Sequence, residues 1–256
     1  MTEPTEPTER PANRAATPAT ARSAPASAST PAPNGTTIFG RGDDLRRLDD
    51  LIGSSPLTSV VGPGGVGKTS LVGALTDRWR VDGRGSVLVR LDGVRDQHGL
   101  VPALTTTLGL TSDVDDQLIT CAEWLSATDQ VLVLDNCEHL LESVTEMVGG
   151  IHATAPPVSV RTTSRLPLGP STESVYRLQP LPVPESVVAD EAMTWPCLEL
   201  FAAAARRAGG IHPVTDEEWM LAIELCRRLD GLPLAIELAA SRLSTLGIRD
   251  LVHGLD

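Results

Sequence analysis

Eight consecutive residues of the chain have the types and spacing of a phosphate-binding loop. Glycines allow such a loop to wrap closely, so that successive backbone N–H groups point inward at an anion. The lysine ammonium would neutralise phosphate oxygens, and the threonine hydroxyl would be a ligand for Mg²⁺. The loop therefore predicts binding of a nucleotide polyphosphate. Its residues match the pattern G-x-x-x-x-G-K-[ST] and are Gly62, Pro63, Gly64, Gly65, Val66, Gly67, Lys68 and Thr69.

The loop also holds the single lysine of the chain. Of the 21 lysine and arginine residues, Lys68 alone is a lysine. A compact ammonium group fits inside a ring of backbone amides, whereas a planar guanidinium fork does not. The helix predicted over 70–79 follows the loop and directs the partial positive charge of its N-terminus at the same place. We therefore expect Ser70, at the start of that helix, to bind the nucleotide together with the loop.

A second candidate element is an apolar strand that ends in a carboxylate. The strand is predicted over 130–134, and Asp135 follows it. A carboxylate there would lie near the phosphate loop, so Asp135 and Thr69 are the expected Mg²⁺ ligands, unless Asp135 caps the following helix instead. The next residue, Asn136, cannot act as a base. Glu138 could replace it as the base that activates water, or could only favour the helix macrodipole, so we expect slow hydrolysis or none.

A third candidate element is a strand that ends in polar residues and an arginine. The strand is predicted over 158–163, and Arg165 follows it closely. Strand ends in open α/β sheets line the ligand crevice, so Arg165 could reach the γ-phosphate and report its presence. The alternative for Arg165 is a surface ion pair, and Arg161 receives no role. The predicted catalytic residues are thus Lys68, Asp135, Glu138 and Arg165.

Alternating strands and helices are expected to position these residues. The run over 130–134 has no polar side chain after Gln130, which is typical of a strand buried on both faces of a parallel sheet. We therefore expect an α/β fold over 37–182, a three-layer P-loop NTPase domain with a parallel five-stranded sheet. The apolar runs predict strands over 57–61, 86–91, 130–134, 158–163 and 175–178, with helices over 70–79, 101–108, 115–126 and 139–148.

The two ends of the chain differ in composition from this domain. Residues 1–36 are rich in Pro, Ala, Thr, Ser and Glu and hold no Leu, Ile, Val or aromatic side chain, so we expect a disordered tail. A proline-rich segment over 180–184 precedes residues with helical period and no strand. Residues 183–256 are therefore expected to form a small all-helical subdomain. Its predicted helices span 191–207, 216–229 and 233–243, and another begins at Ile248.

Two further motifs give the chain a specific resemblance. Phe39-Gly40-Arg41 is similar to the "(V/F)GR" segment, and Gly231-Leu232-Pro233-Leu234 is similar to the GLPL motif, of the STAND class of P-loop NTPases in its NB-ARC-like branch. The stretch over 134–141 is similar to the form found in bacterial transcriptional regulators of the SARP and LuxR-like types. The motifs occur in the order of that family, and the resemblance runs from Ile38 to the C-terminus.

The resemblance implies a nucleotide-dependent switch that binds ATP or ADP with Mg²⁺ and hydrolyses ATP weakly. ADP would hold the module closed, and exchange for ATP would open it. Phe39, Gly40 and Arg41 would lie along the adenine and Pro233 near the base. Arg165 and Pro233 would couple the nucleotide to the relative orientation of the domains. The family continues into a winged-helix segment and further domains that this sequence lacks, so we expect a truncated regulator or a module that acts through protein partners or self-association.

Two other functions stay open. The first is a P-loop kinase or other phosphotransferase that acts on a small molecule, but no segment after Asp135 supplies the arginine-dense lid that it would need. The second is a nucleotide-binding scaffold without turnover, which Asn136 favours.

Charge and composition limit the remaining partners. The net charge of −12 would repel nucleic-acid phosphates, so we expect no direct contact with nucleic acid. No apolar run reaches the roughly 18 residues of a membrane helix, and no apolar signal-peptide segment opens the chain, so we expect a cytoplasmic protein without membrane contact. The cysteine spacings do not fit a zinc site and are interpreted as buried, reduced thiols. The cysteines are Cys121, Cys137, Cys197 and Cys226.

Overall fold

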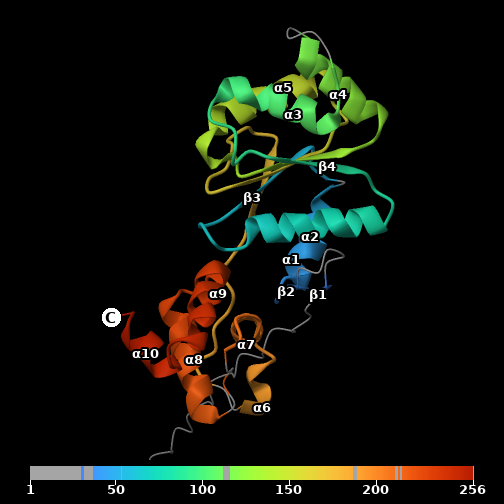
Figure 1. Cartoon of the computed structure of the whole chain (residues 1–256). Helices are drawn as coiled ribbons and strands as arrows, with labels where there is room; N and C mark the ends of the chain where they lie inside the picture. The colour runs from blue at the N-terminus through green and yellow to red at the C-terminus, as the bar shows by residue number, and fades with distance from the viewer. Residues whose placement is uncertain are drawn as a thin grey trace, which may run out of the picture.

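The computed structural model of the chain describes residues 30–31, 37–52, 54–111, 116–186, 189–210, 213 and 215–255. The tail predicted over 1–36 therefore lies almost wholly outside the described residues. The exception is β1 (Thr30–Pro31), which pairs antiparallel with β2 (Thr37–Ile38). In Figure 1 this short pair lies beside the first helices, next to the helical C-terminal region.

The centre of the fold is a five-stranded parallel sheet, as predicted. Its strand order is β4-β5-β6-β3-β7, so β6 lies between the strand before the phosphate loop and the strand that ends at Asp135. Every residue of β3, β5 and β6 is buried, which agrees with a sheet covered on both faces. The strands are β3 (Leu57–Val61), β4 (Ser86–Arg90), β5 (Val131–Asp135), β6 (Val160–Ser164) and β7 (Glu173–Arg177).

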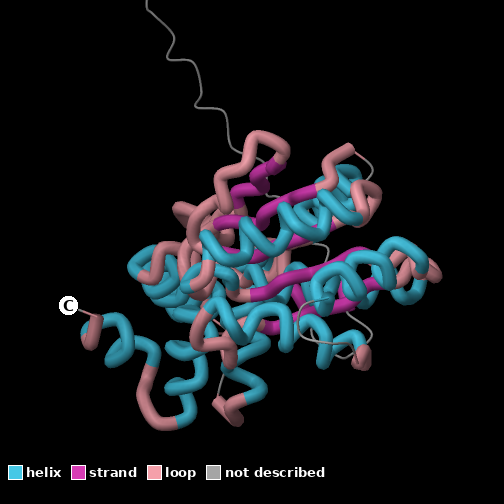
Figure 2. Tube along the Cα trace, turned by 90° about the horizontal axis from the view of Figure 1, so that it is seen from above, coloured by secondary structure: helices cyan, strands magenta, loops and turns pink. Residues whose placement is uncertain are grey.

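Helices cover both faces of the sheet and complete three layers (Figure 1). Successive side chains of β5 point to opposite faces: Leu132 and Leu134 pack in one hydrophobic core, and Val131 and Val133 in the other. Figure 2 shows the magenta strands passing between the helices. One face is covered by α1 (Gly42–Ile52) and α2 (Lys68–Val81). The other is covered by α3 (Leu100–Leu108), α4 (Gln117–Ala127) and α5 (Leu141–Thr154).

The C-terminal region is helical and has a hydrophobic core of its own, in which Phe201, Ile223 and Ile236 are fully buried. A capping box between Thr215 and Glu218 begins α8. The helices are α6 (Ala189–Ala192), α7 (Pro196–Arg207), α8 (Asp216–Arg228), α9 (Pro233–Ser241) and α10 (Ile248–His253).

Several predicted elements have different bounds in the structure, among them the following three. The single helix expected over 191–207 is two helices, because Pro196 lacks a backbone N–H and holds Trp195 in an extended conformation. The helix expected from His139 begins at Leu141 instead, after a 3₁₀ turn over Cys137–His139. The fifth strand runs over 173–177 rather than 175–178.

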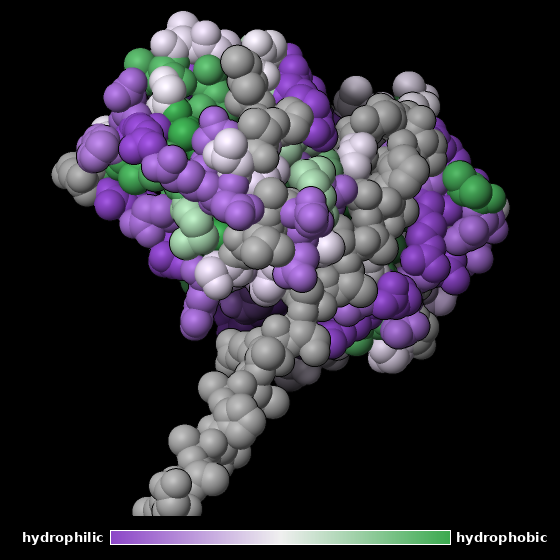
Figure 3. Space-filling model, turned by 90° about the horizontal axis from the view of Figure 1, so that it is seen from below, coloured by the Kyte–Doolittle hydropathy of each residue, from purple (hydrophilic) through white to green (hydrophobic). Residues whose placement is uncertain are grey.

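In the described ranges, no helix combines the length and the apolar character needed to cross a membrane. Figure 3 shows one face of the molecule coloured by hydropathy. Most of its described surface is hydrophilic, and its hydrophobic residues form separate groups.

Candidate nucleotide-binding site

The phosphate loop joins β3 to α2, and its backbone requires glycine at several positions. Gly65 and Gly67 have φ values of 77° and 97°, in the left-handed region that side chains disfavour. A Cβ atom at Gly62 would lie 2.9 Å from the carbonyl oxygen of Leu178. Helix α2 begins at Lys68, two residues before the predicted start, so Ser70 lies in its first turn.

Lys68 is held inside the loop. Its Nζ donates hydrogen bonds to the carbonyl oxygens of Gly62 at 2.9 Å and Pro63 at 3.1 Å, and the residue is 9% exposed. Burial lowers the pKa of Lys68, and Arg165 lowers it further, while the carboxylates of Glu138 and Asp135 raise it. The ammonium group therefore lies in a partly desolvated position, where an arriving anion would restore the favoured environment of the charge.

Asp135 ends β5 and is in contact with the start of α2 and with the neighbouring strand β6. The Thr69 hydroxyl donates a hydrogen bond to Asp135 Oδ1 at 2.9 Å, and the Thr163 hydroxyl donates to the same oxygen. The structure therefore brings the two predicted Mg²⁺ ligands together. A hydroxyl and a carboxylate are hard oxygen donors, so this pair suits the chemistry of Mg²⁺.

Thr163 is a member of this cluster that the sequence prediction missed. It is the last but one residue of β6, the strand between β3 and β5, and its hydroxyl also accepts a hydrogen bond from the backbone N–H of Asn136 at 2.9 Å. Asn136 has a φ of 68°, a left-handed conformation that asparagine tolerates. The polar residues at the end of β6 were the only signal in the sequence for this contact. The strand order is needed to show that the Thr163 hydroxyl lies next to Asp135.

Glu138 and Arg165 form an ion pair beside the loop. Arg165 Nε donates to Glu138 Oε1 at 3.2 Å, and the arginine side chain is 66% exposed against 22% for the glutamate. The Arg165 guanidinium also lies 3.7 Å from the position of a Cβ atom built on Gly64. Glu138 precedes α5, whose first turn holds Glu142 instead. Glu138, the predicted base, and Arg165, the predicted partner of the γ-phosphate, therefore pair with each other next to the loop.

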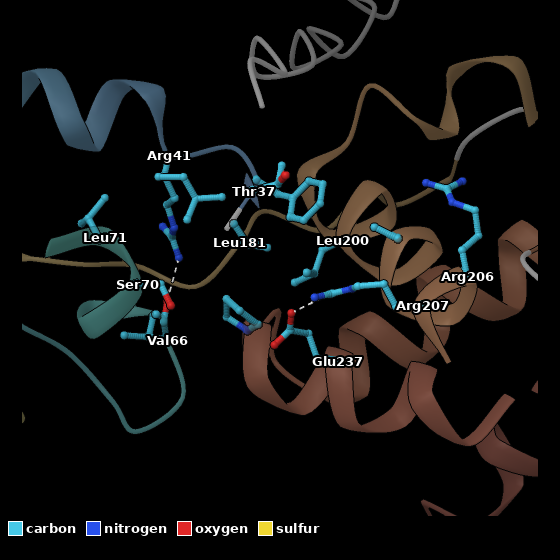
Figure 4. A pocket seen from close by; sticks show the side chains of 15 residues that line it. Thr37, Arg41, Val66, Ser70, Leu71, Leu181, Leu200, Arg206, Arg207 and Glu237 are labelled. Atoms are coloured by element: carbon cyan, nitrogen blue, oxygen red, sulfur yellow. Dashed lines mark hydrogen bonds and ion pairs between the residues drawn. The ribbon is translucent and has the colours of Figure 1, made fainter. Parts of the chain in front are cut away.

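A cavity of about 450 Å³ lies beside the loop, between the sheet domain and the helical region. Figure 4 shows residues of the loop, α2, α7 and α9 around it, together with Arg41, which immediately precedes α1. Its apolar lining includes Ile38, Phe39, Leu181, Leu200 and Pro233. Its polar lining is Thr37, Arg41, Ser70, Arg206, Arg207 and Glu237. This combination of apolar walls with few polar groups is typical of small-molecule sites.

Arg41 is in the cavity wall, but its guanidinium is already engaged. It donates to the carbonyl oxygens of Gln179 at 2.8 Å and Val66 at 3.0 Å, and it pairs with Asp44 at 3.3 Å. The Arg41 side chain therefore connects the loop, at Val66, to the segment that follows β7, at Gln179. Gly40 is not among the residues that line the cavity. It packs against Pro196 instead, where its φ of 66° and the 2.4 Å between a built Cβ and the proline ring require glycine.

The first turn of α9 lies directly against the loop. Leu234 N–H donates a hydrogen bond to the carbonyl oxygen of Gly65 at 3.1 Å, and Pro233 lies 4.0 Å from a Cβ built on Gly67. Gly231 is required before this turn, because a Cβ there would lie 2.2 Å from the carbonyl oxygen of Leu181. The four residues of the Gly-Leu-Pro-Leu motif thus connect the helical region to the loop.

Metal-binding clusters of other kinds are absent from the part of the chain that the structure describes. No group of three or more His, Cys, Asp or Glu side chains there could hold a metal ion. The four cysteines are buried and free, as expected, and burial raises the pKa of the Cys137 thiol to about 12.

Comparison with known proteins identifies similar chains in mycobacteria. An uncharacterized protein of Mycobacterium tuberculosis is 30% identical over 231 residues, which cover 86% of this chain and 54% of that protein. A protein of the same species named "Putative HTH-type transcriptional regulator" is 30% identical over 207 residues, 80% of this chain and 22% of that protein. The chain thus spans about half the length, or less, of these relatives. No family model matches the chain.

Solved structures with low sequence identity share the fold. The Walker-type ATPase of Pyrococcus abyssi has a TM-score of 0.55 at 16% identity, and the match covers 84% of this chain and 70% of that one. A STAND protein (signal transduction ATPase with numerous domains) of Pyrococcus horikoshii, which has a tetratricopeptide repeat sensor, has a TM-score of 0.51 at 16% identity. That match covers 82% of this chain and 31% of the other. The chain therefore has the fold of Walker-type P-loop ATPases.

Proposed function

We propose that the chain is a nucleotide-dependent switch module that binds ATP and ADP with Mg²⁺ and hydrolyses ATP slowly. The single observation that carries this proposal is the cluster of Lys68, Thr69 and Asp135 around the phosphate loop, with a cavity of about 450 Å³ beside it. A polyphosphate suits the loop, and a nucleoside suits the cavity next to it.

Different residues would bind the phosphates, the base and the Mg²⁺ ion. The loop amides and the Lys68 ammonium receive the phosphates, and the apolar walls near Phe39 and Pro233 receive the base. Thr69 and Asp135 supply the oxygen atoms that would hold Mg²⁺, which when bound neutralises phosphate charge. Before any ligand arrives, Lys68 is already held in the loop by two carbonyl oxygens, so little ordering of this side chain is needed.

The switch would work through the contact between α9 and the loop. The hydrogen bond from Leu234 N–H to the Gly65 carbonyl places the helical region against the atoms that surround the phosphates. Arg165 lies beside the same loop, where it could respond to a γ-phosphate. ATP and ADP can shift such an arrangement only if the two nucleotides bind its alternative states with different affinity.

Slow hydrolysis is expected because no strong base is placed next to Asp135. Asn136 follows Asp135 and cannot accept a proton from water, and the nearest acid, Glu138, is paired with Arg165 at 3.2 Å. The same observation favours a second candidate, a nucleotide-binding scaffold without turnover. The two candidates differ in phosphate release alone.

A regulatory role is part of the proposal. It is supported by the relative named as an HTH-type regulator, of which this chain covers a small part. With a net charge of −12, the chain itself is a poor partner for DNA, so a protein partner or another domain would carry DNA binding. Mycobacterial relatives that extend well beyond the matched residues are compatible with this arrangement.

Isothermal titration calorimetry with MgADP and MgATP tests the proposal. We expect saturable heat with both nucleotides, and no heat with either would contradict it. Phosphate release from ATP then separates the switch from the scaffold. Replacing Asn136 with Asp should raise the release rate if the missing base limits it, and Asn136→Ala is the matched control that should not. Transfer of phosphate to an added acceptor would instead indicate a phosphotransferase.

A further inference from the structure

The far wall of the cavity carries an ion pair that the phosphate site does not use. Arg207 Nη2 on α7 lies 2.9 Å from Glu237 Oε1 on α9, and both residues line the cavity. Figure 4 shows the two side chains extended toward each other from the two helices, across from Arg41 and Val66. The glutamate side chain is 40% exposed, so it is accessible to a molecule in the cavity.

The position of Glu237 along α9 relates it to the phosphate loop. Glu237 follows Pro233 by four residues, so both side chains lie on the same face of the helix, a little more than one turn or about 6 Å apart along its axis. Pro233 itself lies against the loop at Gly67. Going along α9 from the loop, Glu237 is therefore the next polar group that a nucleotide with its phosphates in the loop would meet. In a nucleotide, the group next to the phosphates is the sugar.

The chemistry of the carboxylate also fits a sugar. An ionised carboxylate has two oxygens that only accept hydrogen bonds, and Arg207 engages one of them. Vicinal ribose hydroxyls are donors at matching spacing, and a carboxylate is a known partner for a ribose hydroxyl in nucleotide sites. Arg41, another charged group of the cavity, has its guanidinium engaged by two carbonyl oxygens and Asp44.

We propose that Glu237 recognises the ribose hydroxyls of the bound nucleotide, with the Arg207 ion pair holding the carboxylate in place, so that the site selects ribonucleotides over deoxyribonucleotides. This inference rests on the proposed function and deepens it, because it names the part of the nucleotide that the helical region reads.

The experiment measures dissociation constants by calorimetry, with Mg²⁺, for three nucleotides, ADP, 2′-deoxy-ADP and 3′-deoxy-ADP, and separately for inosine diphosphate as a test of base recognition. We expect the unchanged protein to prefer ADP over at least one deoxy analogue by about tenfold, the effect of one hydrogen bond to a charged group. In Glu237→Ala this preference should fall to within about twofold, while the affinity for that deoxy analogue changes little. A general loss of packing would weaken all three nucleotides equally.

Glu224→Ala is the matched control. Glu224 is also a helical glutamate paired with arginine, but it lies on α8 with Arg227 and Arg228 and does not line the cavity. Its loss should leave the preference for ADP unchanged.

Three results would overturn the inference. The first is an unchanged protein that binds ADP and both deoxy analogues equally, and the second is a Glu237→Ala variant that keeps the full preference. The third is a Glu237→Ala variant that alters only the ratio of ADP to inosine diphosphate, because the carboxylate would then read the base. If the unchanged protein binds no nucleotide at all, the proposed function fails, and this inference fails with it.

Discussion

Lys68 and Arg161 are both buried cations of the sheet domain, and their surroundings differ sharply. Lys68 is 9% exposed, donates to two loop carbonyls and has the carboxylates of Glu138 and Asp135 nearby. Arg161 is 2% exposed and donates through Nη1 to two backbone carbonyls, but its Nε and Nη2 have no hydrogen-bond partner among the described residues. Burial, with the nearby Arg84, lowers the pKa of Arg161 to about 10.

The difference lies in position along the strands. Lys68 lies at the carboxyl edge of the sheet, where the loop and strand ends open to a ligand. Arg161 is paired in register with Thr58 within the sheet, and in the described part of the chain the buried Thr58 hydroxyl also has no hydrogen-bond partner. A buried charge beside an opening can gain from an incoming anion, whereas one inside the sheet keeps its desolvation cost. Burial of a cation is thus not by itself a sign of function.

The largest expected effect separates the two cations directly. Lys68→Met should weaken ADP binding by about 100-fold or more, because charge-assisted hydrogen bonds to phosphate are lost. Arg161→Met, an equal change of charge, should alter ADP affinity by less than about twofold. Calorimetry with MgADP on both variants is the measurement. Comparable losses in the two variants would mean that position along the strands does not distinguish them.

A smaller effect on nucleotide affinity is expected from the carboxylate at the carboxyl edge of the sheet, and none from a carboxylate at its amino edge. Asp135→Asn should reduce the gain in ATP affinity that Mg²⁺ provides by about tenfold, because the neutral amide is a poorer ligand for a hard cation. Asp129→Asn is the control, since Asp129 is exposed at the amino edge, just before β5. Titrating ATP with Mg²⁺ and with EDTA measures the gain. If Mg²⁺ raises the ATP affinity of Asp135→Asn as much as that of the unchanged protein, Asp135 is not a ligand of the metal.

Arg161 should also differ from Lys68 in its contribution to stability. Arg161→Met should leave the free energy of unfolding equal or raise it by up to about 2 kcal/mol, because an apolar chain replaces a buried charge whose Nε and Nη2 lack a partner among the described residues. Urea denaturation measures the change. Leu132→Ala, in the fully buried strand β5, should lose about 2–5 kcal/mol and shows that the assay detects core defects. A loss above about 1 kcal/mol in Arg161→Met would show that its two hydrogen bonds outweigh the desolvation cost.

The smallest effect concerns pH. The pKa of Lys68 is lowered, chiefly by burial, from its ordinary 10.5, so just below that pH the unfolded chain still binds the proton that the folded chain has released. The free energy of unfolding of the unchanged protein should therefore rise, relative to Lys68→Met, between about pH 8 and about pH 10. Urea denaturation of both proteins at the two pH values measures this change. A relative fall would mean that the carboxylates, rather than burial, dominate.

Much of the fold could be predicted because its signals are local. Runs of apolar residues predicted all five strands within about two residues, and a contiguous glycine-rich pattern predicted the loop. The prediction of one helix over 191–207 was wrong. The helical period of the residues on both sides of Pro196 favoured a continuous helix, whereas the proline begins a new one. The start of α5 was wrong because the 3₁₀ turn after Asn136 depends on a backbone conformation with positive φ, which sequence signals only weakly.

The candidate site divides in the same way. Lys68, Thr69 and Asp135 could be named from sequence because each lies at the end of a recognisable strand or loop. Thr163 could not, since its contact with Asp135 depends on β6 lying between β3 and β5. Glu237 could not be named either, because it reaches the cavity through the packing of α9 against α7.

Residue types and short-range patterns along the chain fix the chemistry available at the loop: which residues carry the ammonium, the hydroxyl and the carboxylate, and which positions must be glycine. These properties are local, since they depend on residue type and on a few neighbours along the chain. The tertiary structure alone decided the order of the strands, the hydrogen bond from α9 to the loop and the walls of the cavity. Those features arise from contacts between segments far apart in the chain, whose pairing depends on how the whole core packs.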